Sequence, residues 1–235
     1  MPQSNPSELR IHLQTGAATT ALVYPARDPS IGAALILGHG AGAGQHSTFM
    51  VEFARALSDR GLDLVTFNFL YTEQRRRLPD RAPVLEACYR SVIDAVRGHV
   101  ASATRSLFIG GKSMGGRIAT QVAAGDPSLP VAGLILLGYP LHPPGKPEQR
   151  RDAHLPAICR PMLFVQGTRD AFGTPSQLQP VLDTLKPKGT LRVVDEGDHS
   201  FKLSRKDPAR QAALIADIQR DVATWVREVV TASAP

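Results

Sequence analysis

Short apolar runs rich in β-branched residues recur along the chain and alternate with longer stretches whose apolar residues follow a helical period. Such alternation is typical of βαβ units and predicts a mainly parallel sheet. The pattern predicts eight strands, at residues 9–13, 20–24, 33–37, 62–67, 106–110, 133–137, 162–166 and 190–194. It predicts helices at residues 48–60, 84–101, 114–124, 176–186 and 208–230.

These elements predict the α/β fold class, with an eight-stranded, mainly parallel sheet flanked by helices on both faces. The first two strands are short and adjacent in sequence, so we expect them to form an antiparallel edge. A chain of 235 residues, 43% of them hydrophobic, can bury one substantial core, and we expect a single domain over residues 1–235. No long insertion follows the strand at 133–137, so we expect no large lid.

The net charge of +6 and the pI near 9.7 raise the question of nucleic-acid binding. The one dense basic cluster is Arg75, Arg76 and Arg77 with Arg81, and few aromatic residues that could stack on bases lie near it. A solvated loop explains this cluster more simply, although a cluster beside an active site can also steer anionic substrates. We therefore expect no nucleic-acid partner.

The N-terminus is polar and lacks a signal sequence, and the longest apolar stretch, near residues 131–137, is too short to cross a bilayer. These features predict a soluble cytoplasmic protein with no membrane partner, and they leave the oligomeric state open. Cys88 and Cys159 have neither metal-ligand spacing nor the pattern of a disulfide framework. We expect no metal and no organic cofactor.

Residues 110–116 read GGKSMGG, which fits either a phosphate-binding loop or a turn that carries a nucleophile. A phosphate-binding loop needs a glycine where Ser106 stands and a flexible loop where residues 107–110 continue a buried strand, so that interpretation fails. The sequence Gly-x-Ser-x-Gly at 111–115 fits instead, because a strand precedes it and a helical stretch follows it. This context predicts a nucleophile elbow with Ser113 at its tip, and no catalytic role is assigned to Lys112.

A serine nucleophile needs a base that accepts its proton and an acid that orients the base. Asp170 follows the strand at 162–166, and His199 follows the strand at 190–194. The C-terminal ends of parallel strands meet at one edge of a sheet, so these residues can reach Ser113. We therefore predict Asp170 as the acid and His199 as the base. The fallback acids, which lie in the loop of His199 itself, are Asp195, Glu196 and Asp198.

The glycine-rich loop at residues 38–44 follows the strand at 33–37. Its small residues let backbone N–H groups approach a reacting carbonyl, and an acyl-transfer site needs two such donors for the oxyanion. We predict the amides of Ala41 and Met114 as these donors. His39 is expected to pack or to form hydrogen bonds within this loop, and we also count it among the possible pocket residues.

Other polar and aromatic side chains follow strands of the predicted sheet. Tyr71 and Glu73 follow the strand at 62–67, whereas Tyr139 and His142 follow the strand at 133–137. These positions allow two interpretations. The side chains line the substrate pocket, or they only pack the loops.

Several motifs together resemble the small, lid-poor α/β-hydrolases related to dienelactone hydrolases. Among these, the chain is similar to a family whose animal members include a testis-expressed protein and a subunit of a chromatin acetyltransferase complex. The motifs that carry the resemblance are GHGAG at 38–42, NFLY at 68–71, RRLPD at 76–80, GKSMGG at 111–116, GYPLHPPG at 138–145, QGTRD at 166–170 and GDHSF at 197–201. The resemblance implies an α/β-hydrolase fold and a serine hydrolase whose substrates are poorly defined.

The nucleophile of dienelactone hydrolase is a cysteine, whereas this chain has Ser113 at that position. The resemblance therefore favours general ester hydrolysis over that enzyme's own reaction. We predict a carboxylesterase-type serine hydrolase acting on small soluble esters. The alternative is a non-catalytic interaction module that retains the fold, and a degraded triad would be its expected feature.

Overall fold

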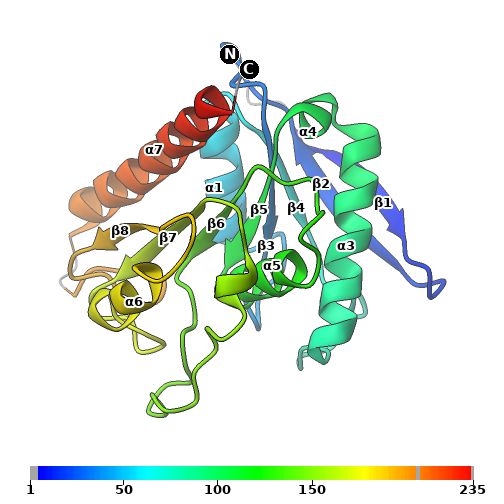
Figure 1. Cartoon of the computed structure of the whole chain (residues 1–235). Helices are drawn as coiled ribbons and strands as arrows, with labels where there is room; N and C mark the ends of the chain where they lie inside the picture. The colour runs from blue at the N-terminus through cyan, green and yellow to red at the C-terminus, as the bar shows by residue number, and fades with distance from the viewer. Residues whose placement is uncertain (1–4, 205–206, 234–235) are drawn as a thin grey trace.

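In the computed structural model, which describes residues 5–204 and 207–233, eight strands form one sheet in the order β1-β2-β4-β3-β5-β6-β7-β8 (Figure 1). The pairs β1–β2 and β2–β4 are antiparallel, and every other neighbouring pair is parallel. The strands are β1 (Ser7–His12), β2 (Ala18–Tyr24), β3 (Ala34–Gly38), β4 (Asp63–Phe67), β5 (Leu107–Lys112), β6 (Gly133–Leu137), β7 (Met162–Gly167) and β8 (Thr190–Val194).

The eight predicted strands are confirmed, with ends that differ from the sequence-based ranges by at most two residues. Every residue of β3, β5, β6 and β7 is buried, because helices cover both faces of these central strands. The expected antiparallel edge is also confirmed, and it extends one pairing further, to β4.

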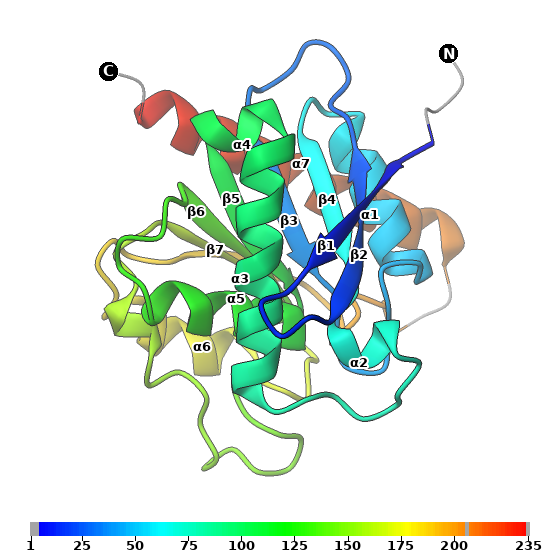
Figure 2. The ribbon, with the colours of Figure 1, turned by 90° about the vertical axis from the view of Figure 1, so that its right-hand side faces the viewer.

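Helices cover the two faces of the sheet, and each layer encloses its own apolar cluster. The helices α1 (Thr48–Ser58) and α7 (Pro208–Ala232) pack on one face and contact each other. On the other face lie α3 (Ala82–His99), α5 (Met114–Ala124) and α6 (Pro175–Leu182); Figure 2 shows α3 crossing in front of the sheet. The predicted arrangement, a mainly parallel sheet flanked by helices on both faces, is therefore confirmed.

Apart from ends that shift by one or two residues, the helices differ from the predicted ones in three respects. The predicted helix at 84–101 is two helices, because Val100 is extended between α3 and α4 (Ala101–Arg105). The short helices α2 (Leu70–Glu73) and η1 (Leu155–Ala157) were not predicted, since one turn is too short to show a helical period. α6 ends at Leu182 instead of residue 186.

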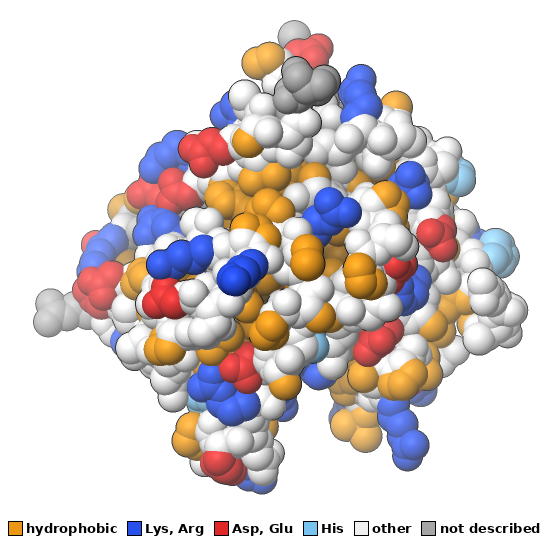
Figure 3. Space-filling model, viewed as in Figure 1, with side chains coloured by type: hydrophobic (Ala, Val, Ile, Leu, Met, Phe, Trp, Pro, Cys, Tyr) orange, Lys and Arg blue, Asp and Glu red, His pale blue; other side chains and the backbone are white. Residues whose placement is uncertain are grey.

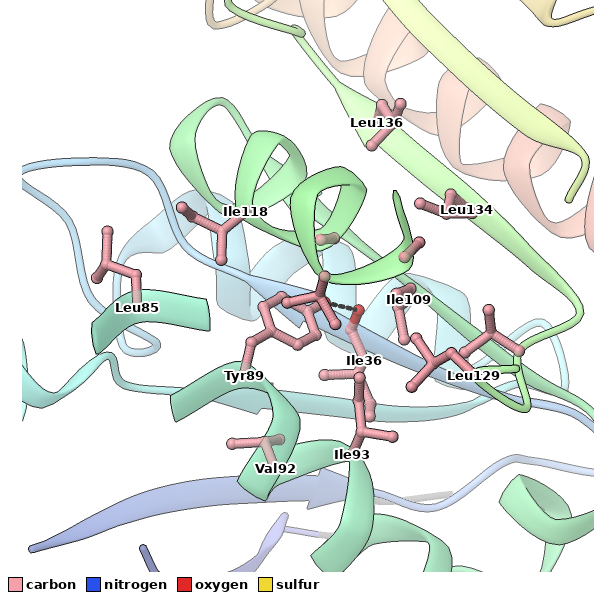
Figure 4. Packing of buried hydrophobic residues seen from close by; sticks show 14 of the residues in the cluster. Ile36, Leu85, Tyr89, Val92, Ile93, Ile109, Ile118, Leu129, Leu134 and Leu136 are labelled. Carbon is pink, nitrogen blue, oxygen red and sulfur yellow. Dashed lines mark hydrogen bonds between the residues drawn. The ribbon is translucent and has the colours of Figure 1, made fainter. Parts of the chain in front are cut away.

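Tyr89 of α3 joins the two strands that lead into the expected site. Its side chain is buried, and its hydroxyl lies 3.0 Å from Ile36 O and 2.7 Å from Gly110 O (Figure 4). Gly110 N also donates to this hydroxyl, at 3.0 Å. Burial raises the pKa of Tyr89, so the hydroxyl keeps its proton. These contacts hold α3 against β3 and β5, and β5 leads directly into Ser113.

The surface carries charges of both signs. On the face shown in Figure 3, Lys and Arg side chains are interspersed with Asp and Glu side chains. Arg75, Arg76 and Arg77 are exposed, and Arg76 pairs with Asp80 at 2.7 Å. Among the described residues, no helix is both long and apolar enough to span a membrane.

Candidate active site

The turn between β5 and α5 has the geometry of a nucleophile elbow. Ser113 has φ 51° and ψ −113°, a region that non-glycine residues rarely adopt. A Cβ atom at Gly111 would lie 2.3 Å from Gly38 O, and one at Gly115 would lie 2.1 Å from the same oxygen. Both positions therefore require glycine. The Ser113 amide donates to Leu137 O at 3.0 Å, which fixes the turn against β6.

The structure brings Ser113, His199 and Asp170 into one hydrogen-bonded chain. His199 Nε2 lies 2.8 Å from Ser113 Oγ, and His199 Nδ1 lies 2.8 Å from Asp170 Oδ2. An ionised carboxylate only accepts hydrogen bonds, so Nδ1 carries the proton of the neutral ring and Nε2 is free to accept from the serine hydroxyl. The Asp170 side chain is fully buried, whereas 21% of the His199 side chain is exposed.

Gln166, a buried residue of β7, holds the carboxylate of Asp170. Its Nε2 donates to Asp170 Oδ2 at 2.9 Å and to Gly173 O at 2.6 Å, and its Oε1 accepts from Tyr139 N at 2.9 Å. Asp170 Oδ1 accepts from the Phe172 amide at 2.8 Å. Gln166 was not predicted as a site residue, although a polar residue within an otherwise apolar strand is a signal for one.

The three fallback acids have other partners. Asp198 Oδ1 accepts from the amides of Ser200 at 2.7 Å and Lys202 at 2.9 Å, which makes it a residue that shapes the loop. Asp195 accepts from the Glu196 amide at 3.0 Å, and Glu196 pairs with Arg210 at 2.9 Å. In the part of the chain that the structure describes, the carboxylate hydrogen-bonded to His199 is that of Asp170.

Lys112 links the elbow to the loop of His199. Its Nζ donates to His199 O at 2.6 Å and lies 5.9 Å and 5.8 Å from the ring centroids of Phe49 and Phe201. Burial lowers the pKa of Lys112 to about 8, although the charge of Asp170 opposes this shift. This role of Lys112 could not be predicted from the sequence, because its partner lies 87 residues away.

The two amides predicted as oxyanion donors border the same cavity as Ser113. Met114 is the first residue of α5, so its N–H has no acceptor within the helix. The Ala41 N–H forms no hydrogen bond with residues 5–204 or 207–233. A Cβ atom at Gly40 would lie 3.6 Å from Ser113 Cβ, so the glycine-rich loop lies against the serine.

His39 is fully buried, and both ring nitrogens are engaged with backbone groups. Nδ1 lies 2.8 Å from Gly40 O and donates to it, whereas Nε2 accepts from the Phe69 amide at 3.1 Å. The ring also makes edge contacts with Phe69 and Tyr71, at centroid distances of 5.1 Å and 5.9 Å. Burial lowers the pKa of His39 to about 4, so the ring is neutral near pH 7.

The four possible pocket residues, His39, Tyr71, Tyr139 and His142, are buried, and none of them lines the cavity beside Ser113. The Tyr139 hydroxyl donates to the Arg151 carbonyl at 2.6 Å. His142 Nδ1 donates to the Pro143 carbonyl at 2.8 Å.

Glu73, which also follows β4, accepts hydrogen bonds from Thr20 Oγ1 at 2.7 Å and from Asn68 Nδ2 at 2.9 Å. These hydrogen bonds of Glu73, Tyr139 and His142 are therefore with the loops and strands around them. A position after a strand end predicts proximity to the site and does not predict the direction of the side chain.

The cavity beside Ser113 has a volume of about 930 Å³. The Phe172 ring lies 4.2 Å from the His199 ring, between centroids, and shields one face of it. The apolar part of the lining includes Phe49, Met50, Leu85, Phe172 and Ile215. The charged part comprises Glu52, Asp80, Lys112, Arg117, Arg151 and Lys202.

Among residues 5–204 and 207–233, no group of three His, Cys, Asp or Glu side chains is arranged to hold a metal ion.

Solved structures with this fold include several hydrolases. A lid-less α/β serine hydrolase from Xanthomonas campestris is 21% identical, with a TM-score of 0.70, and the match covers 100% of this chain and 97% of that one. A dienelactone hydrolase from Anabaena variabilis is 18% identical, with a TM-score of 0.71 and coverage of 94% and 97%. Est1E from Butyrivibrio proteoclasticus, solved with ferulic acid bound, is 14% identical, with a TM-score of 0.69 and coverage of 92% and 99%.

These structural likenesses support the fold, including the absence of a large lid. At the level of sequence, the model of the alpha/beta hydrolase domain family matches residues 32–227, which is most of the chain. That range contains the elbow and both of the loops that carry Asp170 and His199. The chain therefore belongs to the α/β-hydrolase domain family.

Proposed function

We propose that this protein, working as one domain over residues 1–235, hydrolyses carboxylic esters through an acyl-enzyme on Ser113. The observation that carries the proposal is the hydrogen-bonded chain from Ser113 Oγ through His199 to Asp170 at the tip of a nucleophile elbow. A serine hydroxyl is a weak nucleophile unless a neighbouring base accepts its proton. The neutral His199 ring presents Nε2 to that hydroxyl.

In the proposed reaction, Ser113 Oγ attacks the ester carbonyl carbon while its proton passes to His199 Nε2. The buried carboxylate of Asp170 stabilises the imidazolium that forms. The amides of Ala41 and Met114 donate to the oxyanion of the tetrahedral intermediate. The C–O bond to the alcohol then breaks, and His199 returns its proton to the leaving oxygen. A water molecule attacks the acyl-enzyme by the same route, which releases the acid and regenerates Ser113.

The substrates proposed are small, soluble esters. A cavity of about 930 Å³ beside Ser113 is in the size range of sites for small molecules. Est1E, which shares the fold, binds ferulic acid, a small aromatic acid. No metal or organic cofactor enters the proposed reaction.

Steady-state hydrolysis of 4-nitrophenyl acetate by the wild type, by Ser113→Ala and by Ser47→Ala tests the proposal. Ser47 is a matched control, because it lines the same cavity and its side chain does not cap α1. Loss of the nucleophile should lower kcat by at least about 10³-fold, whereas Ser47→Ala should keep the wild-type rate. An unchanged rate in Ser113→Ala would overturn the proposal. A folded wild type with no activity on any ester would favour the non-catalytic interaction module instead.

A further inference from the structure

Two arginines line the cavity beside Ser113. Arg117 lies in the first turn of α5, and its amide donates to Ser113 O at 3.1 Å. Arg151 belongs to the connection between β6 and β7. Both residues are half-buried, and both contribute to the lining of the cavity.

Neither guanidinium group has a partner among the described residues. The nine ion pairs in the described part of the chain include neither Arg117 nor Arg151, and neither guanidinium donates a hydrogen bond there. Asp152 pairs with Arg150 at 2.5 Å, and Glu86 acts on Arg117 only beyond ion-pair distance. A half-buried cation loses part of its hydration. Without a partner, no ion pair or hydrogen bond compensates for this loss.

The electrostatic surroundings of Arg117 favour an anion. Burial lowers the pKa of Arg117, and repulsion by the charge of Arg151 lowers it further. Burial and then the charge of Arg117 lower the pKa of the neighbouring His154, whereas the charge of Asp152 opposes this shift. His154 is therefore neutral near pH 7. An anion between two like charges removes their repulsion and forms charge-assisted hydrogen bonds with both.

The backbone of Arg151 is fixed by two hydrogen bonds. Its amide donates to Leu141 O at 2.9 Å, and its carbonyl accepts from the buried hydroxyl of Tyr139 at 2.6 Å. Tyr139 therefore acts on the cavity through Arg151, although it does not line the cavity itself. An arginine whose backbone is held in this way loses less conformational entropy when it binds a ligand.

We propose that Arg117 and Arg151 form a subsite for a carboxylate carried by the substrate, so that the preferred ester is an acidic one. The inference rests on the proposed hydrolysis at Ser113 and adds the class of substrate. Planar guanidinium groups match the two oxygens of a carboxylate. The other charged residues of the lining are Lys112, Lys202, Glu52 and Asp80, so four cations and two acids face the cavity, an excess that favours anions.

Two matched pairs of esters test the subsite on either side of the ester bond. The acyl side is tested by mono-4-nitrophenyl glutarate against 4-nitrophenyl valerate, and the alcohol side by 4-acetoxybenzoate against 4-methylphenyl acetate. In at least one pair, the wild type should prefer the acid by about tenfold or more in kcat/KM. Arg117→Gln and Arg151→Gln should each reduce this preference by about tenfold. Arg117→Lys should keep part of the preference that Arg117→Gln loses, because lysine keeps the positive charge but lacks the planar guanidinium group.

Arg227→Gln is the matched control, since Arg227 is exposed on α7 and does not line the cavity. It should leave the preference unchanged. Equal kcat/KM values within both pairs in the wild type, or a preference that survives both glutamine variants, would overturn the subsite.

Calorimetric titration with glutarate separates failure of the subsite from failure of the proposed hydrolysis. Glutarate should bind the wild type and bind Arg117→Gln at least about tenfold more weakly. Binding of this kind without hydrolysis of any ester would support the subsite and reject the esterase. Hydrolysis without glutarate binding, or with binding unaffected by either substitution, would reject the subsite and leave the esterase intact. Inorganic phosphate is titrated beside glutarate, and tighter binding of phosphate would overturn the assignment to a carboxylate.

Discussion

Two histidines follow parallel strands at the same edge of the sheet, yet their surroundings differ completely. His39, after β3, is fully buried, and its two nitrogens are engaged with the backbone of Gly40 and Phe69. His199, after β8, is partly exposed, and its nitrogens meet the side chains of Asp170 and Ser113. A position at the edge therefore does not make a histidine a base. We propose His199 as the base because its acceptor nitrogen faces the hydroxyl of Ser113.

The two histidines should also differ in whether they contribute to activity or to stability. His39 cannot shuttle a proton, because the Phe69 amide occupies its one acceptor nitrogen and burial disfavours the charged ring. Its contacts hold the loop that carries Ala41 to the end of β4. His199 differs from His39 in both respects. Its ring is partly exposed to solvent, and a buried carboxylate lies beside it. Substitutions should therefore affect catalysis at one histidine and folding at the other.

The largest expected effect is that of His199→Ala. Without the base, Ser113 keeps its proton, and kcat for 4-nitrophenyl acetate should fall by about 10⁵- to 10⁶-fold. The midpoint of urea unfolding should change little, because the ring is partly exposed. Steady-state kinetics and circular dichroism in urea measure the two quantities. A variant that retains more than about a tenth of the wild-type kcat would break the proposed contrast.

Asp170→Asn should have the next largest effect. An amide at this position can donate to Nδ1, which favours the tautomer whose Nε2 carries a proton and can no longer accept one from Ser113. We expect kcat to fall by about 10⁴-fold. Asp198→Asn is the matched control, because Asp198 lies in the loop of His199 and forms no hydrogen bond with its ring. Equal losses in the two variants would argue against Asp170 as the orienting acid.

His39 should affect the pH dependence of stability. Its folded pKa, about 4, lies below its unfolded value of 6.5, so the unfolded state binds more protons between these values. Stability from the neutral ring is thus full above pH 6.5 and falls as the pH drops towards 4. The loss amounts to about 3 kcal/mol.

Urea unfolding of the wild type and of His39→Asn at pH 7 and pH 4 measures this loss. The gap in unfolding free energy between the two proteins should narrow by about 3 kcal/mol at the lower pH. If the variant does not fold, an NMR titration of the wild type serves instead. A His39 ring that titrates near pH 6.5 would contradict the account.

The smallest expected effect is that of Lys112→Met, which removes the link between the elbow and the loop of His199. We expect kcat to fall by about tenfold with little change in KM, because Lys112 positions His199 through its backbone carbonyl. In the wild type, the link weakens as the ammonium loses its proton near pH 8. The rate should therefore decline above that pH, and Lys112→Met should lack this decline. Lys146→Met, an exposed control, should keep the wild-type profile.

The strands and the elbow could be predicted because their signals are local. Apolar runs mark the buried strands, and Gly111 and Gly115 are required by close contacts with Gly38 O. Asp170 and His199 could be placed because parallel strands end at one edge. The resulting prediction of an eight-stranded α/β-hydrolase fold without a large lid is confirmed.

The supporting residues could not be predicted, because their partners lie far away in the sequence. Gln166 holds Asp170 while also binding Tyr139, and Lys112 reaches the His199 carbonyl across 87 residues. The direction of Tyr139 is likewise set by tertiary packing, which buries its ring and turns its hydroxyl to Arg151. The spacing of residues along the sequence does not predict such contacts.

Labelling with a small fluorophosphonate tests whether Ser113 is an activated nucleophile, without knowledge of the substrate. Intact-mass analysis and peptide mapping would be run on the wild type, Ser113→Ala and Ser47→Ala. We expect a single adduct on Ser113 in the wild type and in Ser47→Ala, and none in Ser113→Ala. A folded wild type that forms no adduct, or an adduct that persists in Ser113→Ala, would contradict this expectation.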